Sequence, residues 1–187
     1  MQPLNRTQIL VAMAVTALIL LMVATLWRRL GAVTLLPWQI TWQSLLLGVA
    51  VGLGITATSA LIYQIWAAYR ASADIYLKLV LKPLLLPDLV WLGLLPGLSE
   101  ELLFRGVMLP ALGGNILALV LSSVCFGVLH LSSPSQWTYA IWATIVGLGL
   151  GFSALESNNL MVPIIAHITA NLVSSYVWKL NNPEPVN

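Results

Sequence analysis

Six polar side chains interrupt otherwise apolar stretches of this sequence. They are Glu100, Glu101, Arg105, His130, His167 and Asn171. Both histidines of the chain are among them, although only 7% of its 187 residues are charged. An ionised side chain at the centre of a bilayer costs about 2.5–3.5 kcal/mol on insertion scales, so membrane segments keep such residues mainly where they have a function. These six side chains are therefore the candidate site residues.

The spacing of these residues places them on three helical stripes. Glu101 and Arg105 are four positions apart, so they share a helix face and can form an ion pair. Glu100 is turned about 100° away from that face. If Arg105 neutralises Glu101, Glu100 is a buried carboxylate without a partner, which must be protonated, paired with a histidine or bound to a cation. The same four-residue spacing joins Phe126 to His130 and His167 to Asn171.

Three such stripes, facing the interior of one helix bundle, would meet in a single pocket. A carboxylate or an imidazole can act as a general base, and amide and imidazole N–H groups can donate to an oxyanion. Two alternatives are polar groups that only join helices, and a proton or ion pathway, which buried Glu and His would also suit. The pathway is less favoured because only one of the three helices carries carboxylates.

Sequence patterns typical of zinc, aspartyl and serine hydrolases are absent. The HExxH zinc motif does not occur, and the only two aspartates, Asp74 and Asp88, fall at the edges of predicted spans. The segment Gly97-Leu98-Ser99-Glu100 breaks the GxSxG pattern of serine hydrolases. We therefore interpret Ser99 as a helix N-cap that follows Pro96-Gly97.

The composition excludes a soluble domain. Hydrophobic residues make up 59% of the chain and the mean hydropathy is +0.93, whereas soluble domains carry roughly 25% charged residues. The net charge of +2 is small and its bearers are dispersed, so no nucleic-acid partner is expected. The single cysteine excludes an intrachain disulfide framework. The sequence predicts an all-α, polytopic helical membrane protein.

About six transmembrane helices are expected, because each span needs about 20 mostly apolar residues. We place them at residues 7–27, 42–66, 84–109, 116–131, 137–155 and 161–178. The first lacks a small-x-small cleavage site and is interpreted as a retained anchor helix. Between the second and third spans, charged residues recur at every fourth position, which predicts an amphipathic interfacial helix. These residues are Arg70, Asp74, Lys78 and Lys82.

The distribution of basic residues predicts that both termini face the cytoplasm. Six spans put the two termini on one side of the membrane, and that side holds five basic residues against two on the other, which favours a cytoplasmic location. The five are Arg6, Arg70, Lys78, Lys82 and Lys179; the two are Arg28 and Arg29. The expected location is a bacterial-type cell membrane or a thylakoid membrane.

Three segments resemble the motifs of one protease family. Ser99–Gly106 (SEELLFRG) is similar to the EExxxRG motif of the CPBP family, the CAAX-protease and bacteriocin-processing membrane proteases also called Abi. Residues 126–130 (FGVLH) resemble its FxxxH motif, and residues 163–171 (PIIAHITAN) its HxxxN motif. Each motif alone is weak, but three in family order are specific. The likeness covers about residues 87–178, whereas residues 1–86 match nothing diagnostic.

The resemblance implies an intramembrane hydrolase that cuts peptide bonds in or beside the membrane. It assigns Glu100 and His130 to activating the attacking water, and His167 and Asn171 to the reacting carbonyl. Glu101 and Arg105 receive a supporting role, as does Phe126, the first residue of the second motif. The chain then divides into an N-terminal part (residues 1–86, two transmembrane helices and the amphipathic connector), a CPBP-like catalytic core (87–180) and a tail (181–187).

The resemblance leaves the metal and the substrate open. As a metalloprotease, the protein would hold a catalytic zinc with Glu100, His130 and His167; we favour a metal-free glutamate mechanism on the same residues. The expected partners are membrane lipid and an unidentified protein or peptide substrate, with no nucleic acid, and a membrane complex is a further candidate. The alternative function is a non-catalytic family member that acts as an immunity factor or assembly partner.

Overall fold

The computed structural model describes residues 4–183, which contain helices and no strand. Residues 184–187, most of the expected tail, lie outside the described residues. The long helices are α1 (Arg6–Leu30), α2 (Trp42–Ile65), α3 (Ala67–Leu81), α4 (Leu89–Glu101), α6 (Ile116–Leu129), α7 (Trp137–Ser157) and α8 (Met161–Asn181). Short segments complete the path: 3-10 turns η1 (Leu86–Asp88) and η3 (Pro134–Gln136), π-helix η2 (Leu102–Met108) and α5 (Leu109–Ala111).

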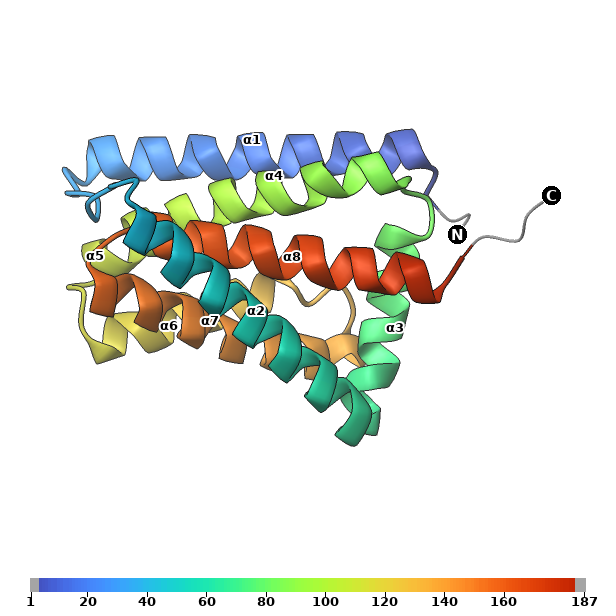
Figure 1. Cartoon of the computed structure of the whole chain (residues 1–187). Coiled ribbons are helices and arrows are strands. Elements are labelled where there is room, and N and C mark those ends of the chain that lie inside the picture. The colour runs from blue at the N-terminus through green and yellow to red at the C-terminus, as the bar shows by residue number, and fades with distance from the viewer. Residues whose placement is uncertain (1–3, 184–187) are drawn as a thin grey trace.

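Helix α8 is the centre of the bundle. It packs between α2 and α4 and also contacts α7, while α6 pairs with α7 and α1 lies along α4 (Figure 1). Glycines make the closest approaches. A Cβ on Gly48 or Gly52 of α2 would come within 2.6 Å or 2.5 Å of α8, and one on Gly97 of α4 within 2.5 Å of Ile168. The Gly48-xxx-Gly52 spacing thus brings two backbones together, as small residues do in membrane bundles.

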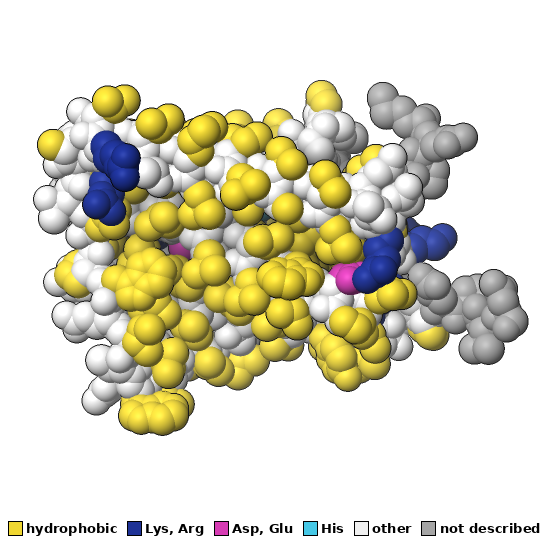
Figure 2. All heavy atoms as spheres, turned by 90° about the horizontal axis from the view of Figure 1, so that it is seen from above, with side chains coloured by type: hydrophobic (Ala, Val, Ile, Leu, Met, Phe, Trp, Pro, Cys, Tyr) yellow, Lys and Arg dark blue, Asp and Glu magenta, His cyan; other side chains and the backbone are white. Residues whose placement is uncertain are grey.

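Four helices are long and apolar enough to cross a membrane, or five if the bent pair Ala67–Leu81 and Leu86–Ala111 counts as one span. The expected number of six is not confirmed. Helix α6 has 14 residues, and at about 1.5 Å per residue it reaches about 21 Å, less than a hydrocarbon core of about 30 Å. Seen over α1, exposed apolar side chains form a band, and charged side chains lie toward its two ends (Figure 2).

Helix α3 lies across one end of the bundle, and its bend from the Leu86–Ala111 segment is 105° (Figure 1). Its apolar side chains Ile75 and Leu79 are exposed at 53% and 42%, whereas Tyr69, Ser72 and Ala73 are buried against the protein. The crosswise direction agrees with an interfacial helix. The packed residues are therefore mainly aromatic and small, together with Leu77 and the buried Leu81, whereas Ile75 and Leu79 face outward.

The start of α1 and the end of α8 both lie at the α3 end of the bundle. Arg6, the first residue of α1, donates two hydrogen bonds of 2.7 Å to the buried carboxylate of Asp88. At the end of α8, Lys179 donates to the carbonyl of Lys82 over 3.2 Å. The start of α1 and the end of α8 therefore share one side, the arrangement expected from an even number of crossings.

Candidate active site

The residues of the first motif span the junction between two kinds of helix. Glu100 and Glu101 end α4, and Arg105 lies in the π-helix that follows. Helix α4 begins at Leu89 and runs through Pro96, so the N-cap interpretation of Ser99 is wrong: its hydroxyl donates to the Leu95 carbonyl one turn earlier. A π-helix has wider turns and is frequent at functional sites. Here the irregular turns begin directly after the two glutamates.

Glu101 is at the centre of a buried charged cluster. Its Oε1 accepts 2.7 Å hydrogen bonds from Arg105 Nη1 and from His167 Nδ1 of α8. Glu101 and Arg105 are both 0% exposed. The ion pair that the four-residue spacing predicts is present, and it has a third member that the spacing did not reveal.

The Arg105 guanidinium is held by two further groups. Its Nη2 donates to the carbonyl of Gly147 on α7 over 2.8 Å, and its Cζ lies 4.6 Å from the centre of the Phe126 ring. A Cβ on Gly147 would lie 3.2 Å from Arg105 Nη2, so only glycine leaves this approach open. Nothing in the spacing of the sequence indicates that the Gly147 carbonyl accepts a hydrogen bond from the arginine.

Glu100 faces a different partner. Its Oε2 is 3.9 Å from His130 Nε2, which is too far for a hydrogen bond. This oxygen is buried and has no hydrogen-bond partner among the described residues. The unpaired carboxylate deduced from charge counting is therefore Glu100, and the nearest imidazole is that of His130.

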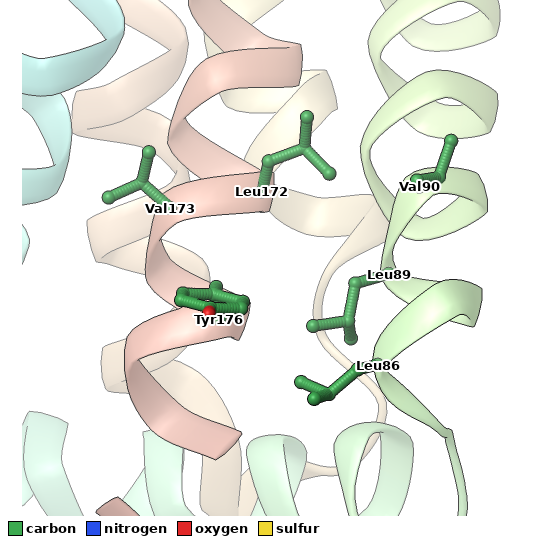
Figure 3. Close-up of a pocket in the computed structure, with 6 residues that line it drawn as sticks. All are labelled: Leu86, Leu89, Val90, Leu172, Val173 and Tyr176. Carbon is green, nitrogen blue, oxygen red and sulfur yellow. The ribbon is translucent and has the colours of Figure 1, made fainter. Parts of the chain in front are cut away.

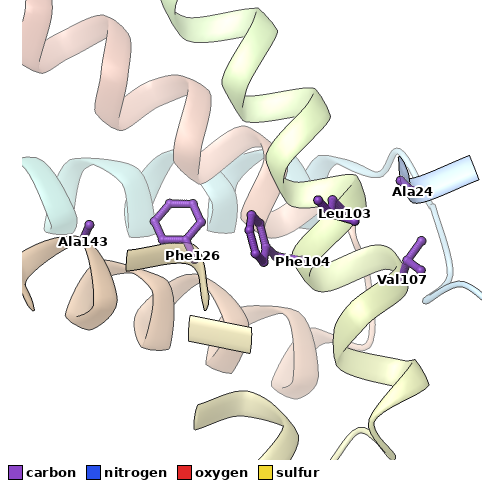
Figure 4. Close-up of a cluster of buried hydrophobic side chains, with 6 residues drawn as sticks. All are labelled: Ala24, Leu103, Phe104, Val107, Phe126 and Ala143. Atoms are coloured by element: carbon purple, nitrogen blue, oxygen red, sulfur yellow. The ribbon is translucent and has the colours of Figure 1, made fainter. Parts of the chain in front are cut away.

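Phe126 connects the two groups. Its ring centre is 4.6 Å from His130, 5.9 Å from His167 and 5.4 Å from Phe104, which it meets edge-on. Figure 4 shows the two phenylalanines facing each other in a buried cluster with Leu103, Val107, Ala24 and Ala143. The predicted convergence on one pocket is thus divided in two: Glu100 with His130, and Glu101 with Arg105 and His167. The Phe126 ring lies beside both histidines and so contacts both groups.

The end of α6 brings His130 to this position. Instead of continuing to residue 131, α6 ends at Leu129, and His130 is its C-cap. Its Nδ1 lies 2.8 Å from the Phe126 carbonyl. A carbonyl only accepts, so Nδ1 carries the proton, and in neutral His130 the Nε2 that faces Glu100 is an acceptor. Because α6 is short, His130 at its end and His167 of α8 can both lie beside the Phe126 ring.

The third motif occupies successive turns of α8. His167 is buried, and Asn171, one turn further on the same face, is partly buried and donates to the Leu92 carbonyl over 3.4 Å. Because Glu101 accepts from Nδ1 of His167, the free nitrogen of that ring is Nε2. The geometry of Asn171 is loose, which leaves its amide free to change partners.

No group of three or more His, Cys, Asp or Glu side chains in the described part of the chain is close enough to hold a metal ion. Of the expected zinc ligands, Glu100 and His130 are neighbours, whereas His167 is directed at Glu101 through the nitrogen that contacts it. The donor set as it stands does not fit a zinc site.

Two apolar grooves open on the surface near these residues. One, with a volume of about 340 Å³, lies between α4 and α8 and is lined by Leu86, Leu89, Val90, Leu172, Val173 and Tyr176 (Figure 3). The other, about 360 Å³, lies between α1, η2 and α6, and its lining includes Phe104 and Leu129, the residue before His130. Neither groove is lined by a charged side chain.

Part of this chain resembles a known protein family and a curated protein. Residues 82–173 match the model of the type II CAAX prenyl endopeptidase Rce1-like family. The chain is also 34% identical over 88 residues to the uncharacterized protein YpbD of Bacillus subtilis (strain 168), a match that covers 47% of this chain and 44% of YpbD. The chain thus spans less than half of the length of that relative, and no solved structure matches it. All seven candidate residues fall inside residues 82–173, the segment of this chain that is similar to the Rce1-like family of type II CAAX prenyl endopeptidases.

Proposed function

We propose that this protein is a membrane-embedded endopeptidase that hydrolyses peptide bonds in or near the membrane. The observation that carries the proposal is the pair of Glu100 Oε2 and His130 Nε2, which lie 3.9 Å apart; the Glu100 oxygen is buried, and the two side chains are 15% and 20% exposed. Both atoms are acceptors when Glu100 is ionised and His130 is neutral. Two acceptors at this separation suit a molecule that donates two hydrogen bonds, and water is that molecule.

The attacking water would lie between these two atoms, donating one O–H to each at about 2.8 Å. Its lone pair would then face the substrate carbonyl. As the oxygen attacks, one proton passes to Glu100, which acts as general base and afterwards returns the proton to the leaving amine. The hydrogen bond from His130 Nδ1 to the Phe126 carbonyl fixes the tautomer that this step requires.

His167 and Asn171 are proposed to stabilise the oxyanion. Because Nδ1 of His167 donates to Glu101, its Nε2 can donate only when the ring is an imidazolium. Charge counting supports that state: two negative glutamates, Glu100 and Glu101, are balanced by Arg105 and a protonated His167. A buried group of charges that sums to zero avoids the desolvation cost of an unpaired ion. The Asn171 amide would be the second donor.

The reaction is proposed to need no metal. The acceptors, the charges and the tautomers account for water activation with side chains alone, and the described residues do not assemble three ligands. We therefore expect activity to survive thorough chelation. Zinc added to the protein is expected to inhibit by binding Glu100 and His130.

The experiment compares wild type with Glu100→Gln and a matched control, Glu156→Gln, at an exposed glutamate at the end of α7. The proteins are reconstituted in liposomes, with or without chelator, and offered internally quenched peptides ending in a CAAX sequence, farnesylated and unmodified. We expect cleavage by wild type and Glu156→Gln, a loss of at least about 100-fold in kcat for Glu100→Gln, the low end for a general base, and no effect of chelation. Near-normal turnover by Glu100→Gln would refute the catalytic assignment.

A proteomic arm covers substrates outside these peptides. Membrane proteins of cells that express wild type or Glu100→Gln are compared for fragments that depend on Glu100. A protein that cleaves nothing in either arm would act without catalysis, as an immunity factor or assembly partner. Wild-type cleavage that is lost on chelation and restored by stoichiometric zinc would replace the metal-free mechanism with a zinc enzyme.

The cellular arrangement is proposed from charge. Because basic residues gather at the α3 end of the bundle, we propose that this end, with both described chain ends, faces the cytoplasm of a bacterial-type cell or the equivalent side of a thylakoid membrane. Substrate and lipid would then meet the protein from within the membrane plane.

A further inference from the structure

Two tyrosines that belong to none of the three motifs cover the Glu100–His130 pair. Tyr76 of α3 and Tyr139 of α7 stack with ring centres 4.6 Å apart and an interplanar angle of 26°. The Tyr139 ring lies 6.3 Å from His130, and His130 also contacts the Phe126 ring at 4.6 Å. The aromatic series Tyr76, Tyr139, His130 and Phe126 therefore extends from α3 to the centre of the charged cluster.

Buried hydroxyl groups fix α3 against the start of α7. Ser72 and Thr138 are 3% and 1% exposed, and their side-chain oxygens are 2.7 Å apart. Thr138 also donates to the Ala68 carbonyl over 3.0 Å. Since Thr138 directly precedes Tyr139 and Ser72 is one turn before Tyr76, these hydrogen bonds hold the two tyrosines in register.

An aromatic cluster supports the same contact. Tyr69 of α3 lies 6.3 Å from Tyr139 and 5.8 Å from Trp142 of α7, ring centre to ring centre. Trp142 in turn donates from Nε1 to Ser59 of α2 over 3.1 Å. Three helices thus contribute to the position of Tyr139. Such support is typical of side chains that hold a site rather than fill a surface.

We propose that Tyr139 and Tyr76 are positioning residues of the hydrolytic site. The Tyr139 ring holds the His130 imidazole against Phe126 with Nε2 directed at Glu100, and Tyr76 holds Tyr139. The inference rests on the proposed function. It extends the site beyond residues 82–173, because Tyr76 comes from α3, which lies outside the region that matches the family.

The Tyr139 ring is the part of that side chain that contacts His130, so we assign this role to the ring. Free rotation of the imidazole would move Nε2 away from the 3.9 Å separation that a bridging water needs. A misplacement of about 1 Å can lower a rate about 100-fold. Tyr139→Phe keeps the ring and should leave kcat within about threefold of wild type, whereas Tyr139→Leu should lower kcat about 10- to 100-fold with KM nearly unchanged. Tyr76→Leu, which acts through Tyr139, should lower kcat about 10-fold.

A matched control lies next to Tyr76 on the same helix. Ile75 is 53% exposed, so Ile75→Ala removes an apolar side chain from α3 without touching the aromatic series. It should keep kcat within about twofold. Glu100→Gln in the same assay shows whether the cleavage is that of the proposed site, which separates a failure of the inference from a failure of the proposed function.

A spectroscopic measurement tests the positioning without any substrate. The chain has two histidines, so protein labelled with 15N-histidine gives two ring spin systems, and His167→Gln assigns them. Wild type, Tyr139→Phe and Ile75→Ala should show His130 as the Nδ1–H tautomer. Tyr139→Leu should show ring shifts averaged between tautomers. An unchanged tautomer pattern in Tyr139→Leu, or wild-type kcat in that variant while Glu100→Gln is inactive, would overturn the proposal.

Discussion

Arg105 offers the sharpest test of how the interior is held together. The variant Arg105→Met keeps a long side chain in the core but removes the charge. Glu101 loses its 2.7 Å ion pair, and the Gly147 carbonyl loses its donor. Both partners of the ion pair are 0% exposed, so water cannot replace the guanidinium. Removing one member of a buried pair costs about 3–5 kcal/mol, and the orphaned carbonyl is part of that loss.

The double variant Glu101→Gln with Arg105→Met isolates the charge. It removes the uncompensated carboxylate, and the amide oxygen of Gln can still accept from His167 Nδ1. The free energy of unfolding should therefore fall less in the double variant than in Arg105→Met alone, with a coupling of about 0.5–3 kcal/mol. Arg28→Met, at an exposed arginine near the end of α1, is the control and should change little.

Unfolding would be followed in mixed micelles with increasing denaturing detergent, using the fluorescence of the eight tryptophans. A loss of 3–5 kcal/mol changes the folded-to-unfolded ratio by about 10²- to 10³·⁵-fold, which such a titration resolves. If the double variant is as unstable as Arg105→Met, or less stable, the two residues do not stabilise each other, and the account of the buried cluster fails.

Two further predictions use other parts of the structure. A Cβ on Gly147 would meet Arg105 and Phe126 at 3.2 Å, whereas one on Gly149 has no neighbour within 4 Å. Gly147→Ala should therefore lower the free energy of unfolding by about 1–3 kcal/mol through overpacking. Gly149→Ala should raise it by about 0.5–1 kcal/mol. Equal effects of the two alanines in the same unfolding titration would contradict the close approach of Arg105 to α7. For the orientation, Glu156→Cys and Asn182→Cys are each made in a Cys125→Ser background. A membrane-impermeant maleimide added to intact cells should label Glu156→Cys from outside and should not label Asn182→Cys. Reaction of Asn182→Cys from outside would reverse the proposed topology.

The sequence by itself determined the class of protein and most of its elements. An apolar run long enough to span predicts a helix because the backbone must satisfy its own hydrogen bonds in lipid, and helices α1, α2, α7 and α8 begin and end within a few residues of the predicted limits. The pairing of Glu101 with Arg105 also followed from sequence, since helical geometry alone brings positions four apart together. The candidate residues could be selected because charge in an apolar segment is costly.

The tertiary structure decided which of those residues meet. Spacing along one helix contains no information about its neighbours, so it did not show that His167 contacts Glu101 rather than Glu100, nor that Gly147 accepts from Arg105. The expected full span at 116–131 failed because α6 stops at Leu129. The helix thus ends two residues before the expected limit, with His130 as its C-cap beside Glu100.

Helix α3, which carries Tyr76, also shows what a sequence pattern can and cannot predict. The charged residues at every fourth position of α3 predict an amphipathic helix. A second pattern on the same helix is the i, i+3, i+4, i+7 spacing of a packed face, which Tyr69, Ser72, Ala73 and Tyr76 follow. That signal was in the sequence. The sequence did not show which helix this face packs against, because helix packing depends on surfaces that only the folded chain brings together. Here the face packs against the first turn of α7.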